Sequence, residues 1–350
     1  MPERRPTRWR WLVLLVLAAA AVVWTVRDRW LHEFRWREFA ASFANLEWKW
    51  VAAAALLALA TYYGRALRWA VMLEPLRPRA DVWGIFKATA IGFAAVVLLG
   101  RPGEFIRPYL ISVRERVPFS SQLAAWFLER VCDLLAILLV FGFAAGRIDN
   151  SRARLGPAFG WVIETGGWVA AVLGVICLGI LILVGRFSDL VRSRLMAALR
   201  VLPERHHGRI DQTISAFMEG TAATASHGSV LRLSLYTAVE WLLIAGCFAC
   251  VFQAYEQTAG MQAQDVFIFM GFVAFGSVLQ IPGVGGGVQL VSIFVLTQMY
   301  GVPIEVATSL AILLWIVTFV VIVPPGLALA FHEGLNWRKL RDLEKQLGQT

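Results

Sequence analysis

Long apolar runs separated by short polar segments dominate the chain. Runs of membrane-spanning length are found at 11–26, 50–73, 120–145, 161–184, 230–255 and 304–330. A helix needs about 20 apolar residues to cross the ~30 Å hydrocarbon core of a bilayer. The pattern therefore predicts an all-α polytopic membrane protein with six full spans. The polar and aromatic segment 27–49 suits a helix at the membrane interface.

Two further apolar runs are interrupted by glycine and proline. The run 83–99 ends at Gly100-Arg101-Pro102-Gly103 and continues as the short piece 104–113, and the run 266–281 ends at 282–287 and continues as 288–300. Each short piece reaches only about half-way through the bilayer at 1.5 Å per residue. Broken backbone at membrane depth is tolerated only inside protein or beside a water-filled cavity. We therefore expect two re-entrant hairpins, with a solvent-facing loop as the alternative for the first break.

The two breaks occupy matching places in the chain. Each leads to a Val-Pro pair, Val117-Pro118 or Val302-Pro303, that opens a long helix. With both hairpins re-entrant, segments 1–10, 65–87, 114–116, 186–209 and 338–345 carry 21 Lys and Arg on one side, against 8 in segments 27–49 and 147–154 on the other. The positive-inside bias places both termini in the cytoplasm. The two halves then have opposite orientations, which predicts an inverted repeat whose broken helices meet near the midplane.

The same pattern defines the domain organisation. We expect a first, uncleaved span with the interfacial helix at 1–49, a membrane domain at 50–331 and a basic cytoplasmic tail at 332–350. Half one is 1–160 and half two is 161–331, with a cytoplasmic linker at 186–228. Arg65 and Arg68 end the span 50–73, where long side chains can reach the headgroups.

Composition supports a membrane protein and excludes several other classes. The chain is 58% hydrophobic and only 16% charged, whereas soluble domains average about 25% charged. The net charge of +9 lies between apolar segments, which indicates membrane topology and no nucleic-acid partner. Four cysteines fall in apolar runs and five histidines lack metal-ligand spacing. No nucleophile–base set or phosphate loop is present in the sequence, so we expect no catalytic residues, metal or cofactor.

The first break concentrates charge where charge is costly. Glu104 opens a short helix whose amino end would favour an anion, and Arg101 and Arg107 lie on either side of it. Arginine suits bidentate phosphate binding. A compatible alternative is that Glu104 pairs with one of these arginines and only neutralises the hairpin.

The second break and the span 120–145 add further candidates. Gly283, Gly285, Gly286 and Gly287 would let backbone amides approach a ligand closely. Glu129 and Asp133 share a helix face, and Arg130 reaches Asp133 at i,i+3. Ionisable residues inside a membrane are functional candidates by default, although an ion pair that only holds helices together is the alternative.

These motifs resemble one family. The run Leu99-Gly100-Arg101-Pro102-Gly103-Glu104-Phe105-Ile106-Arg107, followed by Glu129-Arg130-x-x-Asp133, resembles the lysylphosphatidylglycerol synthase transmembrane-region family of flippase-like proteins. Pro282-Gly283-x-Gly285-Gly286 and Gly301-Val302-Pro303 fit it as well. Gln289 stands where the family usually has Glu, and Trp315 lies where Arg is common. We expect this chain, which ends at Thr350, to lack the soluble aminoacyl-transferase domain of bifunctional members.

The resemblance implies lipid handling. We expect a non-enzymatic flippase or transporter in the cytoplasmic membrane that moves a polar or anionic lipid, or a lipid-linked precursor, between leaflets. Its expected partners are lipids with phosphate headgroups and, as a further candidate, a lipid-modifying enzyme. The alternatives are a membrane enzyme and an accessory subunit acting on a lipid phosphate.

Overall fold

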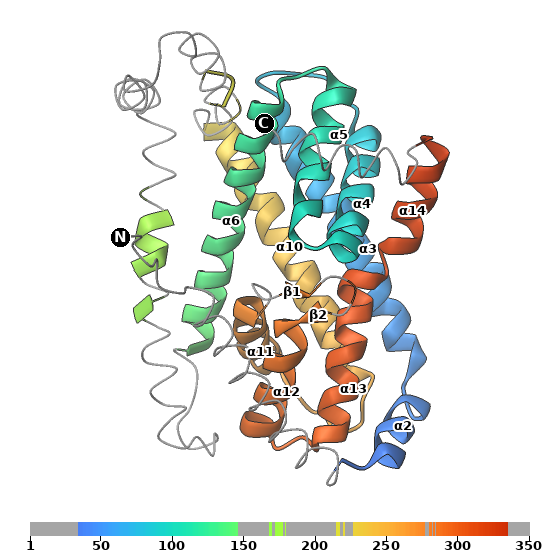
Figure 1. Ribbon diagram of the computed structural model, residues 1–350. Coiled ribbons are helices and arrows are strands. Elements are labelled where there is room, and N and C mark those ends of the chain that lie inside the picture. Colours follow the sequence, from blue (N-terminus) through green and yellow to red (C-terminus); the bar gives the residue numbers. More distant parts are fainter. Residues whose placement is uncertain are drawn as a thin grey trace, which may run out of the picture.

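The structure is a bundle of long helices (Figure 1). The computed structural model describes residues 34–145, 168–169, 172–177, 179, 215–217, 220, 227–276, 280–281, 283 and 285–334. The expected spans 11–26 and 161–184, the linker 186–228 and the tail 332–350 lie wholly or mostly outside these residues.

Apolar segments form the long helices, as the hydropathy pattern predicts. Among the described residues, four helical segments are long and apolar enough to cross a membrane: Trp48–Leu73, Val82–Leu99, Gly228–Gln253 and Ile304–His332. They correspond to α3 (Trp48–Leu73), α4 (Val82–Leu99), α10 (His227–Gln253) and the helices from α13 to α14. α6 (Phe119–Ala145) is as long but contains Glu129, Arg130 and Asp133. The chain is an all-α, multi-pass membrane protein.

The first break forms a hairpin of helices. Gly100 ends α4 with a φ of 74°, a 3-10 turn, η1 (Arg101–Phe105), follows, and α5 (Ile106–Glu115) returns alongside α4. Gly103 packs so tightly on α4 that a Cβ there would come within 2.5 Å of the carbonyl carbon of Ala95. Glycine is required at both positions, first by backbone conformation and then by space.

The second break forms a hairpin from the opposite end of the bundle (Figure 1). It consists of α11 (Ala263–Gly276), β1 (Gln280–Ile281), β2 (Gly285–Gly286) and α12 (Gly287–Tyr300). The two short strands pair antiparallel. Gly285 and Gly286 have φ values of 102° and 138°, which side chains rarely allow.

Contacts between helix ends define an upper and a lower end of the bundle, named as in Figure 1. At the upper end, Glu333, just after α14 (Val323–His332), contacts Lys87 of α4 and Arg114 of α5. At the lower end, the amide of Glu47, before α3, donates to the carbonyl of Ala254, after α10. The first hairpin therefore starts and ends at the upper end, with its tip inside the bundle.

The two tips meet. The amide of Gly283 donates a hydrogen bond of 2.9 Å to the carbonyl of Val97, in the last turn of α4. Carbonyls in the last turn of a helix have no partner within that helix, and lipid offers none. The amide of Gly283 in the second break therefore satisfies the carbonyl of Val97, which the first break leaves without a partner inside α4.

Cysteines at Val97 and Gly283 should form a disulfide or link through a short thiol reagent. The backbones of these residues are in direct contact, and a disulfide needs Cα atoms within about 7 Å. The background should lack Cys132, Cys177, Cys247 and Cys250. Cysteine fits at Gly283 because no atom of the described residues lies within 4 Å of a Cβ there, although its φ of 73° is unfavourable. Gel mobility reports the link, and a Val97–Gly260 cysteine pair is the control. Equal linking in both pairs, or in neither, would contradict the meeting of the tips.

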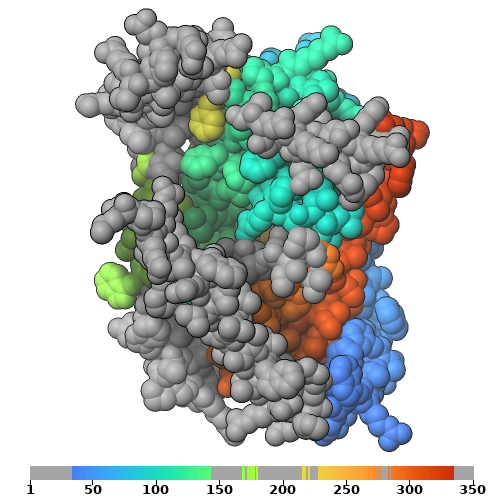
Figure 2. Space-filling view, in the orientation of Figure 1, coloured from blue at the N-terminus to red at the C-terminus, as the bar shows by residue number. Residues whose placement is uncertain are grey.

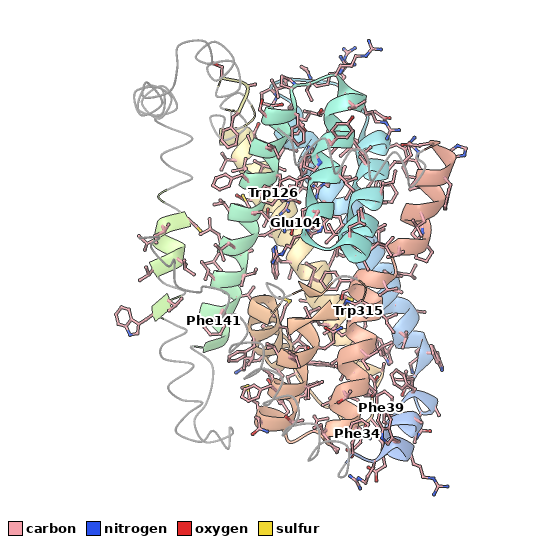
Figure 3. The ribbon with its side chains drawn as sticks, in the orientation of Figure 1. Phe34, Phe39, Glu104, Trp126, Phe141 and Trp315 are labelled. Atoms are coloured by element: carbon pink, nitrogen blue, oxygen red, sulfur yellow. The ribbon has the colours of Figure 1, made fainter. Side chains whose placement is uncertain are left out.

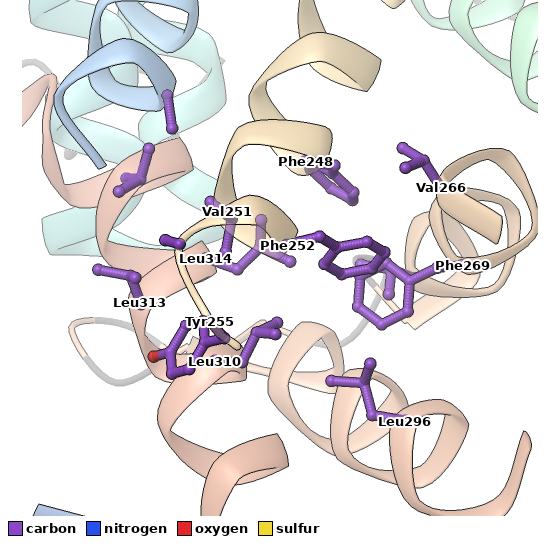
Figure 4. Close-up of a cluster of buried hydrophobic side chains, with 14 of the residues drawn as sticks. Phe248, Val251, Phe252, Tyr255, Val266, Phe269, Leu296, Leu310, Leu313 and Leu314 are labelled. Atoms are coloured by element: carbon purple, nitrogen blue, oxygen red, sulfur yellow. The ribbon is translucent and has the colours of Figure 1, made fainter. Parts of the chain in front are cut away.

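The largest apolar core fills the lower half of the bundle. Phe248 and Phe252 of α10 contact Phe269 of α11 edge-to-face, with ring centroids 6.0 and 4.9 Å apart. Leu310 and Leu314 of α13 (Ile304–Trp315) complete this cluster (Figure 4). The core therefore fixes the second hairpin against α10 and α13.

The expected single span 304–330 is not one regular α-helix. α13 passes into a π-helical turn, η4 (Ile316–Val320), before α14 begins. Pro324 and Pro325 stand in the first turn of α14 and lack the amide hydrogens that the carbonyls four residues earlier would need. The prolines thus interrupt regular α-helical hydrogen bonding just after η4, an irregularity that hydropathy alone does not reveal.

A short helix lies against α13 near the lower end. α2 (Trp36–Ala44) has no fully buried residue, as suits the interfacial helix expected within 27–49. Arg35 pairs with Glu305 at 3.3 Å, and Ser42 donates to Ser309 at 2.7 Å. Figure 2 shows this blue segment at the lower edge of the bundle, beside the orange and red of the last helices.

Reporter fusions at Arg116 and Gly260 should report opposite sides of the membrane. Arg116 lies between α5 and α6 at the upper end, and Gly260 lies between α10 and α11 at the lower end. The charge bias predicts a cytoplasmic signal at Arg116 and an external one at Gly260. Signals from the same side at both positions would exclude the two-hairpin topology.

Candidate functional site

Three carboxylates lie buried in the middle of the helices. Glu129 and Asp133 of α6 and Glu240 of α10 are between 0% and 7% exposed. An uncompensated charge in such a place is very costly, so each carboxylate needs a cationic or hydrogen-bonding partner. Arginines from α3, from α5 and from α6 itself provide them.

Arg68 of α3 is the central partner. Its Nη1 lies 2.7 Å from Asp133, its Nη2 lies 2.6 Å from Glu129, and Glu240 is 3.3 Å away. The side chain is only 1% exposed. The expectation that Arg68 reaches the headgroups is therefore wrong, because three acids hold it inside the bundle.

Arg65, one turn earlier on the same face of α3, joins the same group. It contacts Glu240 at 2.6 Å and lies 3.8 Å from both Glu129 and Asp133. It is 15% exposed, so it does not extend to the headgroups either. Without Arg65 and Arg68, the count of cations on the cytoplasmic side falls from 21 to 19, which leaves the charge bias intact.

Arg107 comes from α5 of the first hairpin. It contacts Glu129 at 3.1 Å, and its guanidinium carbon lies 3.9 Å from the centre of the Trp69 ring. A Cβ on Gly92 of α4 would come within 2.5 Å of the Arg107 Cβ, so glycine there lets α5 approach. The hairpin thus places Arg107 face-on against an aromatic ring, a favourable arrangement for a cation.

Arg130 occupies a more open position. It lies 3.4 Å from Glu129 and 3.3 Å from Asp133, as the i,i+3 spacing predicts, but 40% of its side chain is exposed. Within the described residues, the Nε groups of Arg107 and Arg130 have no hydrogen-bond partner. Both Nε atoms are themselves buried, so they are not offered to the cavity in this conformation.

Arg101 and Glu104 form a separate pair at the tip of the first hairpin. Their contact is 2.9 Å, with Arg101 55% exposed and Glu104 17% exposed. The predicted neutralising pair is therefore present, and it leaves the charge of the buried group unchanged.

A cavity of about 370 Å³ adjoins this group. Its polar lining includes Arg101 and Glu104 from the tip of the first hairpin and, of the four arginines of the group, all but Arg68. Figure 3 shows Glu104 and Trp126 near the middle of the bundle. The charged residues in the lining are Arg65, Arg101, Glu104, Arg107, Arg130 and Asp133.

The lining changes from polar to apolar toward the lower end. Leu134 and Ile137 follow Arg130 by one and two turns of α6 and also line the cavity. Phe248 of α10 and Met270 of α11 continue the apolar surface. The cavity can therefore accept an anionic group at one end and hydrocarbon at the other.

The second break contributes to this cavity through Val288. In the described part of the chain, the amides of Gly283, Gly285, Gly286 and Gly287 do not line it. Gln289 does not line it either, and its Oε1 accepts a hydrogen bond of 2.7 Å from the amide of Gly286. The break lies beside the cavity, and Gln289 stabilises the start of α12.

The comparisons with known proteins agree with this architecture. A family model described as "Lysylphosphatidylglycerol synthase TM region" matches residues 11–326. The chain belongs to this family. No solved structure matches the chain. This member of the lysylphosphatidylglycerol synthase transmembrane-region family is also similar to the glycosyltransferase AglD of Haloferax volcanii, with 29% identity over 56% of this chain. The match covers 36% of the relative, so the chain spans only part of its length.

Sequence reasoning missed three members of the buried group in this family member. Arg65 and Arg68 were assigned to the interface, and Glu240 was not singled out. The signal was available, because Glu240 is an acid within an apolar span and the two arginines share one helix face. The pairing of acids with arginines depends on packing between α3, α6 and α10. No local sequence pattern predicts this pairing.

Proposed function

We propose that this protein moves an anionic lipid, or a lipid-linked precursor, between the leaflets of the cytoplasmic membrane. The observation that supports the proposal is the cavity, which is cationic at one end and apolar at the other. A lipid with a phosphate headgroup has the same two-part character. The protein acts as a transporter, without covalent chemistry on the lipid.

The balance of charge favours an anionic headgroup. Arg65, Arg68, Arg107 and Arg130 outnumber Glu129, Asp133 and Glu240 by one, and the Arg101–Glu104 pair adds nothing. An excess positive charge in a low-dielectric site needs a counter-charge. Guanidinium groups bind phosphate oxygens in a bidentate manner, and Arg65, Arg107 and Arg130 line the cavity.

The architecture supports movement across the membrane. Two hairpins enter from opposite ends, and their tips join through Gly283 and Val97. Interrupted helices at matching positions in two halves are typical of transporters with inverted repeats, whose site lies near the midplane. We infer re-entrant hairpins, an inverted repeat and cytoplasmic termini, with a lipid-modifying enzyme as a candidate partner.

Reconstitution in liposomes tests the proposal. A phosphatidylglycerol with a fluorescent label on one chain is placed in both leaflets, and a membrane-impermeant reductant bleaches the outer label. We expect bleaching to proceed past the outer-leaflet fraction when the protein is present, with the lipid mass unchanged. Retention of the inner label, as in protein-free liposomes, would exclude equilibrating transport.

A second candidate is a membrane enzyme, or its accessory subunit, that acts on a lipid phosphate. The Haloferax volcanii relative is named a glycosyltransferase, which favours this candidate. Mass spectrometry of the liposome lipids separates the two functions. A covalently altered lipid supports the second candidate and contradicts the first.

A further inference from the structure

We infer that Glu240 sets the charge of headgroup that the cavity accepts, so that a phosphodiester carrying one negative charge is preferred to a phosphomonoester carrying two. This inference rests on the proposed function and assigns specificity to a residue behind the site. Glu240 acts through Arg65 and does not itself contact the lipid.

The position of Glu240 separates it from the ligand. It is 1% exposed and absent from the cavity lining, whereas its partner Arg65, at 2.6 Å, does line the cavity. Its other oxygen faces Arg68 at 3.3 Å. Glu240 therefore contributes its charge to the site without contacting the ligand.

The formal charge of the site depends on this residue. With Glu240 ionised, the four arginines exceed the acids by one, and without its charge they would exceed them by two. A single negative charge on the headgroup neutralises the first arrangement. A doubly charged headgroup would leave an uncompensated negative charge in a low-dielectric site, where interactions between charges are several times stronger than in water.

The other two acids are less suited to this role. Glu129 contacts Arg68, Arg107 and Arg130, so its loss would disturb the positions of three arginines at once. Asp133 lines the cavity and would meet the headgroup directly. Glu240 is the acid whose charge can change with the least change in the shape of the site.

The test measures preference between two lipids. Purified protein in detergent is titrated with short-chain phosphatidylglycerol and short-chain phosphatidic acid, and bound lipid is counted by native mass spectrometry. At about pH 8 the phosphomonoester is mostly doubly charged, because its second pKa is about 6. We expect the wild type to prefer phosphatidylglycerol and Glu240→Gln to shift the affinity ratio toward phosphatidic acid by about tenfold. Glycerol phosphate has the same phosphomonoester but no acyl chains. Its binding therefore distinguishes a site for lipids from a site for free phosphate compounds.

Two further variants test whether the net charge of the site causes the change in the affinity ratio. Arg65→Gln with Glu240→Gln removes one charge of each sign, so the ratio should return toward that of the wild type. Glu305→Gln removes a buried acid outside the site and should leave the ratio unchanged. If Glu240→Gln fails to fold, Arg65→Gln alone should weaken phosphatidylglycerol binding about tenfold.

The outcomes are distinct. A ratio unchanged in Glu240→Gln, or equal weakening of both lipids as a purely structural role predicts, overturns the inference and leaves the proposed function standing. Binding of neither lipid by the folded wild type overturns both.

Discussion

Arg68→Met should lower the thermal stability of the protein in detergent. The substitution leaves Glu129, Asp133 and Glu240 without their shared partner, at distances where Arg68 now compensates all three. Breaking a buried ion pair by removing one partner costs about 3–5 kcal/mol. For a protein of this size that corresponds to a fall in Tm of roughly 4–7 °C, measured by thermal unfolding.

A matched pair of controls accompanies this variant. Arg232→Met removes an arginine whose pair with Glu74 is solvent-exposed, so the Tm should change little. Adding Glu129→Gln to Arg68→Met should recover part of the loss, because one unpaired carboxylate disappears. If Arg68→Met unfolds at the temperature of the wild type, Arg68 is not the residue that compensates the buried acids.

Arg130→Ala should abolish lipid movement in the liposome assay while the protein still folds. Its side chain is 40% exposed and lines the cavity, and Arg68 continues to pair with both acids after its loss. The formal charge of the site falls by one, which removes the excess that favours an anion. We expect at least a tenfold fall in the initial rate.

Arg130→Lys separates charge from geometry. Lysine restores the charge but not the planar fork of the guanidinium, so the rate should recover only in part. Arg232→Ala, at the upper end and outside the cavity, should transport normally. A wild-type rate in Arg130→Ala would remove this residue from the site.

The sequence predicts the helical parts of the fold well, because burial in lipid imposes a simple rule. Spans must be long and apolar, so α3 and α10 begin and end within a few residues of the expected boundaries. The breaks are equally visible, since Gly100 and Gly285 adopt backbone conformations that few other residues allow. The π-helical turn before Pro324 was missed, because hydropathy does not register backbone hydrogen bonding.

The site was only partly predictable. The sequence identified the residues of the first break and of α6, and the structure brings Arg107, Glu129 and Arg130 together. It assigned Arg68 to the interface, because an arginine near a helix end usually extends to water when no acid is nearby in the chain. The acids of α6 lie 61 and 65 positions further on, and only the packing of α3 against α6 and α10 reveals the pairing.

This separation along the chain has a consequence for biosynthesis. Ribosomes add about 5–20 residues per second, so α3 emerges roughly 3–12 s before the acids that neutralise Arg68. An arginine costs about 2.5–3.5 kcal/mol at the centre of a lone inserting helix on the translocon scale, and less near a helix end, where Arg68 lies. The nascent helix can avoid this cost by remaining at the translocon, or by holding its arginines near the headgroups, until α6 arrives. The location that hydropathy assigns to Arg65 and Arg68 is then the one that they would occupy before α6 and α10 pack against α3, and the full burial of both arginines waits for Glu240 in the second half.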